Sequence, residues 1–348
     1  MAVITSELLR LLPKAELHCH LDGSVRPETL IELGREYRKA MPRDDADSLR
    51  EYMRVDDAKS LEDYLARFDV TLSVMQTAES LERIAYELSI DAAREGVRYI
   101  EIRYSPVLNV KEGLSFGEAV EAPLRGLERA ERDGGAMARV IICGLRHLDP
   151  QVSLELARLA VSYKHRGVVA FDLAGGELGF PASAHAAAFA HAREHDLPCT
   201  CHAGEGADAS YVRDAIHLCG AHRIGHATRL IEDESLTQYV NDRRIALEIC
   251  LTSNVQTKAV ESYEQHPLRN YYDRGMNVVL NTDNRLMSGT TLTDEYALAA
   301  RHFDFTLDDL ARIALNGFES SFLPYEKREE LIEKIKRDLV ALGAKVAA

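Results

Sequence analysis

The chain has 348 residues, of which 46% are hydrophobic, and it carries a formal net charge of −14. This length can bury one large core or two small ones, and an acidic chain without a basic cluster is poorly suited to binding a nucleic acid or an anionic membrane. No apolar run approaches the ~20 residues that span a bilayer, and the N-terminal segment lacks the features of a signal peptide.

The predicted strands are short, rich in β-branched residues and separated by segments with helical periodicity. Eight are expected, at residues 15–21, 97–104, 138–145, 168–173, 198–203, 223–228, 246–252 and 277–282. Alternating strands and helices predict a parallel sheet with crossover helices, and eight such units favour a closed (β/α)8 TIM barrel, an α/β fold, over an open sheet. No linker rich in Pro, Gly or Ser divides the chain, so residues 1–348 are expected to form a single domain.

The connection between the first two strands, residues 23–96, is much longer than one helix requires. Part of it carries an apolar stripe at helical spacing, formed by Leu61, Tyr64, Leu65, Phe68 and Leu72. An insertion after the first strand emerges at the catalytic face of such a barrel. We therefore expect extra helices here that serve as a substrate lid, with simple packing of the stripe on the barrel as the alternative.

The six cysteines mostly lie within the apolar, strand-like runs, at positions 19, 143, 199, 201, 219 and 250. Such positions suit reduced, packed thiols and predict a cytoplasmic protein. The sequence contains no signal for an oligomeric state.

The first predicted strand places His18, His20 and Asp22 on alternate positions within "AELHCHLDG". Side chains alternate between the two faces of a strand, so these three are expected to point the same way. Two imidazoles held side by side form half of a metal site, although paired histidines also occur for other reasons. The remaining ligands have to come from elsewhere in the chain.

Further histidines and carboxylates stand at the ends of other predicted strands, where the active site of a (β/α)8 barrel lies. They are His202 and Glu205 after the fifth strand, His226 after the sixth, and Asp283 and Asn284 after the eighth. Three histidines and one carboxylate can hold Zn²⁺ with a position left for water, whose pKa then falls from 15.7 toward ~7. Hydrolysis also needs an acid and a base. These residues alone leave open whether His202 or His226 binds the metal.

Six segments, in order, carry a family resemblance: "PKAELHCHLDGS", "DLAGGE", "CHAGE", "RIGHAT", "LEICLTSNVQT" and "NTDN". Together they resemble the adenosine deaminase family of metal-dependent amidohydrolases, over about residues 5–330. The resemblance implies an enzyme with one Zn²⁺ per chain that hydrolyses adenosine, and 2′-deoxyadenosine, to inosine and ammonia. Its partner would be a small purine nucleoside, with no nucleic acid and no membrane. The alternative is a sibling deaminase acting on adenine or aminofutalosine.

The same resemblance assigns roles to individual residues. The expected zinc ligands are His18, His20, His202 and Asp283, and Asp283 also counts as catalytic. Glu205 is expected to protonate purine N1 as hydroxide attacks C6, while His226 orients and deprotonates the water. The expected substrate contacts are His20, Asp22 on a ribose hydroxyl, the backbone N–H of Gly175 on purine N3, Asn284, and an apolar gate of Leu61, Tyr64, Leu65 and Phe68.

The chain departs from the better-known family pattern after Asp283, where Asn284 and Arg285 replace Asp and Pro. An Asn amide donates a hydrogen bond without taking up a proton, so we expect Asn284 to contact purine N7, with capping of the following turn as the alternative. Leu21 and Asp22 stand where adenine-specific relatives carry Ile and Glu, which favours a ribose-bearing substrate. A non-catalytic protein on this fold would be expected to lose a ligand or Glu205, and all are present.

Overall fold

The computed structural model describes residues 4–56 and 67–346. Within these ranges all eight predicted strands are present, namely β1 (Lys14–His20), β2 (Val97–Tyr104), β3 (Met137–Leu145), β4 (Val168–Ala174), β5 (Thr200–Ala203), β6 (Arg223–His226), β7 (Ala246–Ile249) and β8 (Val278–Leu280). Strands β5 to β8 are shorter than predicted, because the apolar pattern continues into loop residues beside the strand ends.

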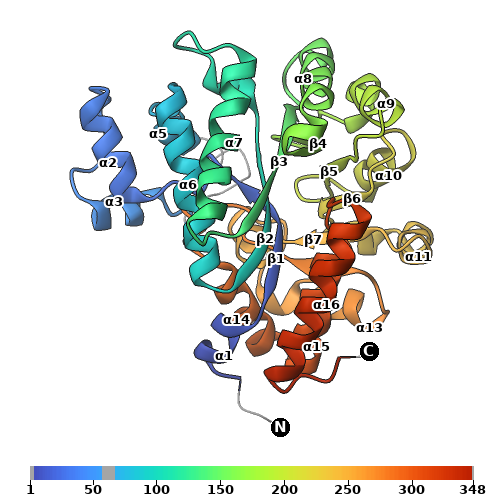
Figure 1. Ribbon diagram of the computed structural model, residues 1–348. Coiled ribbons are helices and arrows are strands. Elements are labelled where there is room, and N and C mark those ends of the chain that lie inside the picture. Colours follow the sequence, from blue (N-terminus) through green and yellow to red (C-terminus); the bar gives the residue numbers. More distant parts are fainter. Residues whose placement is uncertain (1–3, 57–66, 347–348) are drawn as a thin grey trace.

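The strands form a closed parallel barrel surrounded by helices (Figure 1). Two four-stranded sheets, ordered β1-β2-β3-β4 and β5-β6-β7-β8, are joined at both seams by bridges, Cys19 with Asp283 and Phe171 with Cys199. At the first seam the His20 N–H donates to the Asp283 carbonyl at 2.7 Å. The predicted (β/α)8 architecture is confirmed.

Helices connect each strand to the next, and those that follow the segment after β1 number one or two in each connection. They are α6 (Ala78–Arg94), α7 (Phe116–Arg132), α8 (Pro150–Ser162), α9 (Ala186–Glu194), α10 (Ala209–His217), α11 (Glu234–Asp242), α12 (Leu251–Gln256) and α13 (Leu268–Asp273). The short α1 (Ser6–Leu11) precedes β1, and α14 (Leu292–His302), α15 (Leu307–Glu319) and α16 (Tyr325–Ala341) follow β8. Capping boxes begin several of them, for example Thr77 with Ser80 at α6 and Ser115 with Glu118 at α7.

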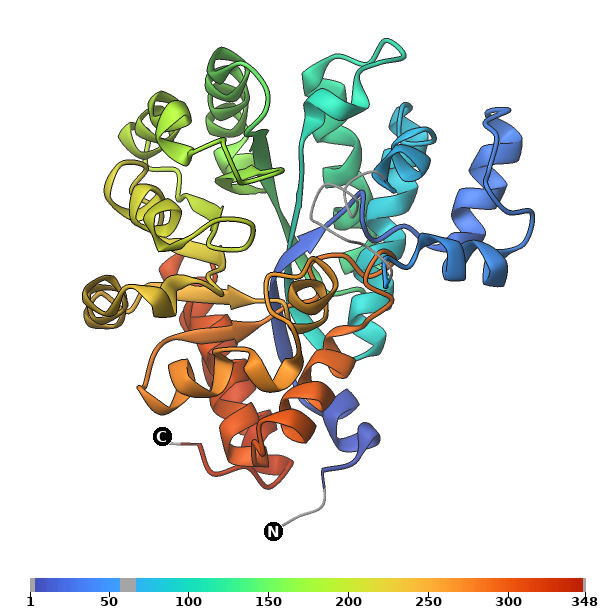
Figure 2. The same cartoon turned by 180° about the vertical axis from the view of Figure 1, so that it is seen from behind.

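The segment between β1 and α6 carries the predicted extra helices, α2 (Pro27–Glu36), α3 (Ala46–Met53) and α5 (Phe68–Leu72). Both views show α2 and α3 at the edge of the molecule, away from the strands (Figures 1 and 2). Phe68 lies in α5, whereas the predicted gate residues Leu61, Tyr64 and Leu65 lie outside the described residues. The role of this segment as a lid stays a prediction.

A network of buried ion pairs fills the barrel interior. Arg103 on β2 donates to Asp172 at 3.0 Å and to Glu248 at 2.8 Å, and Arg223 on β6 pairs with Glu248 at 2.6 Å and with Glu101. Burial opposes ionisation of Glu248, but the two guanidinium groups outweigh it and lower the pKa of this carboxyl. The network ties β2, β4, β6 and β7 together beneath the rim where the strands end.

None of the described helices is both long enough and apolar enough to cross a lipid bilayer.

Candidate active site

The end of β1 presents the two histidines of "AELHCHLDG". His18 is fully buried, and its ring centroid lies 5.4 Å from that of His20. The intervening Cys19 and the flanking Leu17 and Leu21 are fully buried. Both imidazoles therefore reach the rim of the barrel, as the alternation of side chains predicts.

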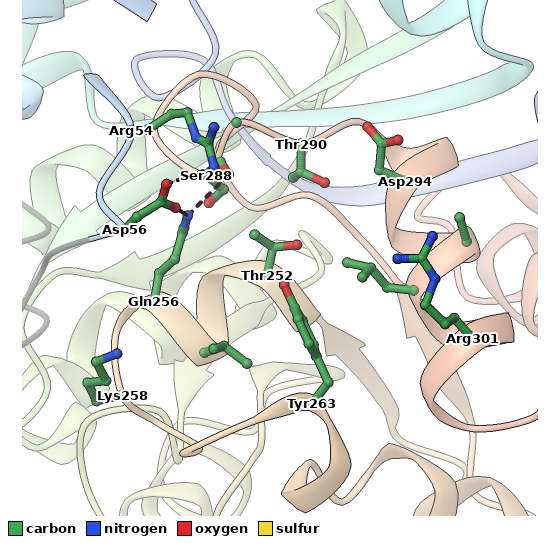
Figure 3. Close-up of a pocket in the computed structure, with 14 residues that line it drawn as sticks. Arg54, Asp56, Thr252, Gln256, Lys258, Tyr263, Ser288, Thr290, Asp294 and Arg301 are labelled. Carbon is green, nitrogen blue, oxygen red and sulfur yellow. Dashed lines mark hydrogen bonds and ion pairs between the residues drawn. The ribbon is translucent and has the colours of Figure 1, made fainter. Parts of the chain in front are cut away.

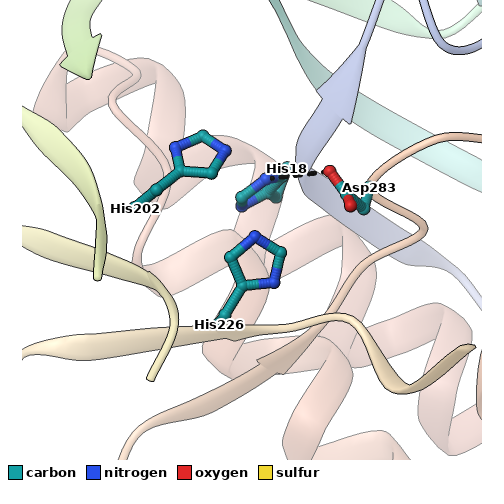
Figure 4. Close-up of side chains that lie close together, drawn as sticks. All are labelled: His18, His202, His226 and Asp283. Carbon is teal, nitrogen blue, oxygen red and sulfur yellow. Dashed lines mark ion pairs between the residues drawn. The ribbon is translucent and has the colours of Figure 1, made fainter. Parts of the chain in front are cut away.

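Figure 4 shows three imidazoles and one carboxylate converging at this rim, from His18, His202, His226 and Asp283. Their ligand atoms all lie within 4.8 Å of one another. His20 adjoins the same group, with its Nε2 atom 3.1 Å from His202 Nε2 and 3.4 Å from Asp283 Oδ1. The structure thus brings together all five residues that the sequence places at four different strand ends.

The spacing of these donor atoms fits a metal ion. Ligand atoms held about 2.0–2.1 Å from a tetrahedral ion lie about 3.3 Å apart. The two distances from His20 Nε2 are close to this value, and so is the 3.3 Å distance from His18 Nε2 to Asp283 Oδ1. His18 Nε2 is buried and has no hydrogen-bond partner. Two sets of four ligands share His18, His202 and Asp283, and they differ in whether His20 or His226 completes the set.

Polar side chains behind the cluster orient its members. Glu248 Oε2 lies 2.9 Å from His18 Nδ1, and Asp172 Oδ2 lies 3.1 Å from His202 Nδ1. The Ser253 hydroxyl donates to Asp283 Oδ2 at 2.6 Å. A carboxylate on Nδ1 directs the Nε2 lone pair toward a metal. Asp172, Glu248 and Ser253 all stand in the quoted motifs, but nothing in the sequence predicts that they contact these ligands.

Burial lowers the pKa of three imidazoles of the cluster, those of His20, His202 and His226, which favours the neutral form that binds metals. The pKa of His18 is raised instead, because the carboxylates of Asp283 and Glu248 outweigh its burial. Burial also opposes ionisation of Asp283, but the adjacent His18 imidazole outweighs it and holds the pKa of Asp283 well below its usual value. Neutral imidazoles beside an ionised carboxylate are the forms a divalent ion requires.

Glu205 follows β5 and lies beside this cluster. Its Oε2 atom is 3.5 Å from His226 Nε2, while its buried Oε1 atom has no hydrogen-bond partner. Burial, together with the nearby carboxylates of Asp283 and Glu177, raises the pKa of Glu205 well above its usual value. The raised pKa favours the protonated carboxyl of Glu205, the form that can act as an acid.

The loop that carries Glu205 is held by a second buried carboxylate. Glu177, which follows β4, accepts hydrogen bonds from the backbone N–H groups of residues 204–207 at 2.7–3.1 Å. Four donors on one carboxylate fix the path of the loop, and with it the position of the Glu205 side chain. Glu177 is the last residue of "DLAGGE", but the sequence alone does not predict this role.

The backbone is strained at two of the predicted site residues. His226 and Asp283 have φ angles of 65° and 61°, in the left-handed region that residues other than glycine rarely adopt. The Asp283 N–H donates to the His18 carbonyl at 3.0 Å, so pairing with β1 holds this conformation. Gly225 beside His226 admits the neighbouring ring, because a Cβ atom there would lie 2.9 Å from His18 Cε1. Strain at such positions is typical of functional sites.

A cavity of about 260 Å³ opens onto the cluster. Its apolar wall includes Phe68, Leu72, Leu108 and Leu145, and its polar wall includes Asp22, Gly175 and Asn284 together with His20, His202, Glu205, His226 and Asp283. Asp22 Oδ1 and Asn284 Oδ1 are buried without hydrogen-bond partners. Gly175 has a φ of 97°, a conformation that favours glycine. Every predicted substrate contact that the structure describes therefore lines one cavity.

Arg285, the second departure from the family pattern, points away from this cavity. Its largely buried guanidinium forms ion pairs with Glu16 on β1 and with Glu95 ahead of β2. It therefore anchors the segment after β8 to the first two strands, and Asn284 alone reaches the cavity.

A second cavity, of about 390 Å³, lies between α12 and α14 (Figure 3). Its labelled lining includes Arg54, Asp56, Gln256 and Arg301, and none of the predicted site residues borders it. Helix α12 separates the two cavities, because its Asn254 contacts His226 while its Gln256 lines the second cavity.

Comparison with known proteins places this site in a family. The family model described as adenosine deaminase matches residues 13–338. A probable adenosine deaminase of Dictyostelium discoideum is 44% identical over 92% of this chain, which spans only 42% of that relative's length. An adenosine deaminase of Clostridium kluyveri is 36% identical, with 94% of this chain and 95% of the relative aligned.

Two solved structures share the fold. An adenine deaminase from Arthrobacter aurescens superposes with a TM-score of 0.87 at 27% identity, covering 93% of this chain and 98% of that one. The N6-methyl-AMP deaminase from Arabidopsis thaliana superposes with a TM-score of 0.85 at 29% identity, covering 96% and 98%. The fold thus carries deaminases of a free base and of a nucleotide as well, so the substrate has to be argued from the cavity.

Proposed function

The chain belongs to the adenosine deaminase family, and we propose that it hydrolyses adenosine to inosine and ammonia. One observation carries the proposal. Donor atoms spaced for a metal ion, and the buried Glu205 carboxyl with an unpartnered oxygen and a raised pKa, face the same cavity, which has room for a small ligand. Hydrolysis of a ring amine needs a nucleophilic oxygen and a proton donor on the ring, and these two features would supply them.

The residues proposed to hold a single Zn²⁺ are His18, His20, His202 and Asp283. When bound, the ion supplies a water whose pKa lies near 7 rather than 15.7. The carboxylates of Glu248 and Asp172 keep the rings of His18 and His202 oriented toward the ion.

Glu205 is proposed to protonate purine N1. Attack of the oxygen at C6 places negative charge in the ring, and a proton delivered to N1 neutralises it. The C6–N bond then breaks as the attached oxygen becomes a carbonyl, and the hydroxyl proton that this oxygen gives up leaves with the amino group as ammonia. The proton released when the water ionises restores the Glu205 carboxyl. The unpartnered Oε1 atom of Glu205 supports this role, because it can meet a ring nitrogen without losing another contact.

The remaining polar groups of the cavity are proposed to hold the nucleoside. Asp22 and His20 would bind a ribose hydroxyl, the Gly175 backbone N–H would meet N3, and Asn284 would meet N7. A 5′-phosphate is disfavoured, because the described residues that line the cavity include Asp22 and Asp69 but no Lys or Arg. A free base would leave Asp22 without a partner. A ribonucleoside therefore suits the cavity better than AMP or adenine.

The six thiols of the chain are free and buried, which supports the proposed location in a reducing, cytoplasmic compartment.

A substrate panel tests the proposal. Zinc-loaded protein is given adenosine, 2′-deoxyadenosine, adenine, AMP and aminofutalosine, and the loss of the amino group is followed by absorbance and by released ammonia. The two adenine nucleosides are expected to have the highest kcat/KM. A higher kcat/KM for adenine, AMP or aminofutalosine contradicts the proposal.

A further inference from the structure

We propose that a hydrogen-bond chain from the backbone N–H of Leu268 through His266 and Asn254 fixes the tautomer of His226, so that His226 presents an Nε2–H donor to the nucleophile. His266 and Asn254 thereby become positioning residues. Placement of the proton follows from the hydrogen bonds alone, whereas its catalytic consequence rests on the proposed function.

The series of hydrogen bonds begins at a backbone N–H, a group that can only donate. The Leu268 N–H donates to His266 Nδ1 at 3.0 Å, so Nδ1 is the acceptor of the ring. Burial lowers the pKa of His266 to about 3, which keeps the ring neutral. A neutral imidazole whose Nδ1 accepts a hydrogen bond carries its proton on Nε2.

This proton orients the amide of Asn254. His266 Nε2 lies 3.2 Å from Asn254 Oδ1, so the amide oxygen accepts from the ring. Asn254 Nδ2 then faces His226 Nδ1 at 2.9 Å and donates to it. The neutral His226 ring consequently carries its proton on Nε2, the atom that faces Glu205. His266, Asn254 and His226 are at most 4% exposed, so bulk water does not compete for these bonds.

Two histidines of the same cluster provide an internal contrast. The Nδ1 atoms of His18 and His202 face the carboxylates of Glu248 and Asp172, which only accept hydrogen bonds when ionised. In the neutral form, both rings therefore carry their proton on Nδ1 and keep the Nε2 lone pair free for a metal. His226 faces an amide donor instead and has no Nε2 lone pair to offer. His20, whose Nε2 lies 3.4 Å from Asp283 Oδ1, therefore completes the ligand set.

The tautomer also decides where Glu205 keeps its proton. An Nε2–H on His226 points toward Glu205 Oε2, 3.5 Å away, and leaves the carboxyl proton on the unpartnered Oε1. With the opposite tautomer, Glu205 would donate this proton to the His226 lone pair instead of to the purine. The hydrogen-bond chain from Leu268 thus reserves the acid proton for the substrate and gives the attacking oxygen a hydrogen-bond donor. A neutral His226 with its proton on Nε2 cannot take a proton from the water, so this role replaces the deprotonation of the water that the family resemblance implies for His226.

The direct test is ¹⁵N NMR of protein labelled at histidine, in the metal-free and the zinc-loaded form. The signals of His226 are identified by their loss in His226→Gln. We expect a protonated Nε2 and an unprotonated Nδ1 in both forms. A protonated Nδ1 on neutral His226 overturns the proposal, and this readout needs neither substrate nor a variant that disturbs the chain.

A variant tests the catalytic consequence. Asn254→Asp places a carboxylate where it accepts from both neighbours, so the proton of His226 should move to Nδ1 while the signals of buried His185 stay unchanged. We expect kcat for adenosine to fall by about 10²–10⁴-fold, the range for a misplaced catalytic proton, with KM changed far less. His266→Gln, which keeps a donor toward Asn254, should retain more kcat than His266→Phe.

A moved proton with unchanged kcat in Asn254→Asp contradicts the catalytic part. A wild-type protein that binds zinc but does not deaminate adenosine counts against the proposed function instead, and it leaves the NMR result standing.

Discussion

Two groups of buried polar residues sit one above the other in this barrel, and they differ in how completely they are paired. In the interior, Glu248 accepts from Arg223 and Thr200 on one oxygen and from Arg103 and His18 on the other. At the rim, buried atoms have no hydrogen-bond partner, namely His18 Nε2, Asp22 Oδ1, Glu205 Oε1 and Asn284 Oδ1. Other buried atoms also lack partners, Arg103 Nε in the interior among them, but Asp22, Glu205 and Asn284 line one cavity. Native proteins rarely leave buried polar atoms unpaired, so this grouping indicates where a ligand binds.

The two groups are joined through His18 and His202. Each ring has its Nδ1 atom on an interior carboxylate, Glu248 or Asp172, and its Nε2 atom at the rim. The interior carboxylates therefore orient the two imidazoles, and the Nε2 atoms at the rim stay available to bind a ligand. Substitutions in the interior should first affect stability and metal affinity, and substitutions at the rim should first affect turnover.

The largest effect on turnover is expected for Glu205→Gln. The amide cannot deliver a proton to N1, so kcat should fall by about 10²–10⁴-fold, while zinc content and the free energy of unfolding stay near wild type. Steady-state kinetics and elemental analysis measure both quantities. Near wild-type kcat in this variant means that the acid has been misassigned.

The interior counterpart is Glu248→Gln. Loss of this carboxylate removes a negative charge that Arg103 and Arg223 both pair with in a buried site. We therefore expect the free energy of unfolding to fall by about 3–5 kcal/mol relative to wild type. Zinc affinity should also fall by about 10–100-fold, because His18 loses the partner that orients it. Denaturant titration and zinc competition measure these effects, with Glu261→Gln on the surface as the matched control. Wild-type stability in Glu248→Gln contradicts the interior role.

The eight strands and the rim residues could be predicted from sequence because both depend on local patterns. Short β-branched runs mark the strands, and His18, His202, His226 and Asp283 each follow or end one of them. The topology rule for barrels then brings strand ends together. The partners behind them could not be predicted in this way. Glu248 is 230 residues away from His18, and only the order and register of the strands bring the two together.

The partners of individual polar side chains could not be predicted from the sequence either. Asn254 and Glu177 are visible in "LEICLTSNVQT" and "DLAGGE", but neither motif says that one faces an imidazole and the other faces four backbone N–H groups. Likewise Arg285 is visible as a departure from the family pattern, whereas its burial between Glu16 and Glu95 depends on packing around the first two strands.

Asp22→Ala, a substitution at the rim, is expected to have a smaller effect on the deamination of adenosine than Glu205→Gln. If Asp22 binds a ribose hydroxyl, its loss should reduce kcat/KM for adenosine by ~1.5–3 kcal/mol, the usual contribution of a charged hydrogen bond. Turnover of adenine, which has no ribose, should change much less. Equal losses for both substrates would assign Asp22 to the metal site or the fold.

The smallest effect is expected for Asn284→Ala. The structure records no side-chain hydrogen bond from Asn284 to the described turn that follows, where Ser288 donates to the Asn284 backbone carbonyl. An N7 contact therefore accounts for its place in the cavity better than a cap does. We expect kcat/KM for adenosine to fall by ~1–3 kcal/mol, and 7-deazaadenosine, which lacks N7, to be almost unaffected. Equal responses of the two substrates would make Asn284 structural.

The metal requirement of the rim tests the whole account most directly. Purified protein, chelator-treated protein and protein reconstituted with Zn²⁺ are compared by elemental analysis and by adenosine turnover. We predict about one Zn²⁺ per chain in the active protein, loss of turnover when the metal is removed and recovery when it returns. Full turnover by protein shown to contain no metal would contradict the account.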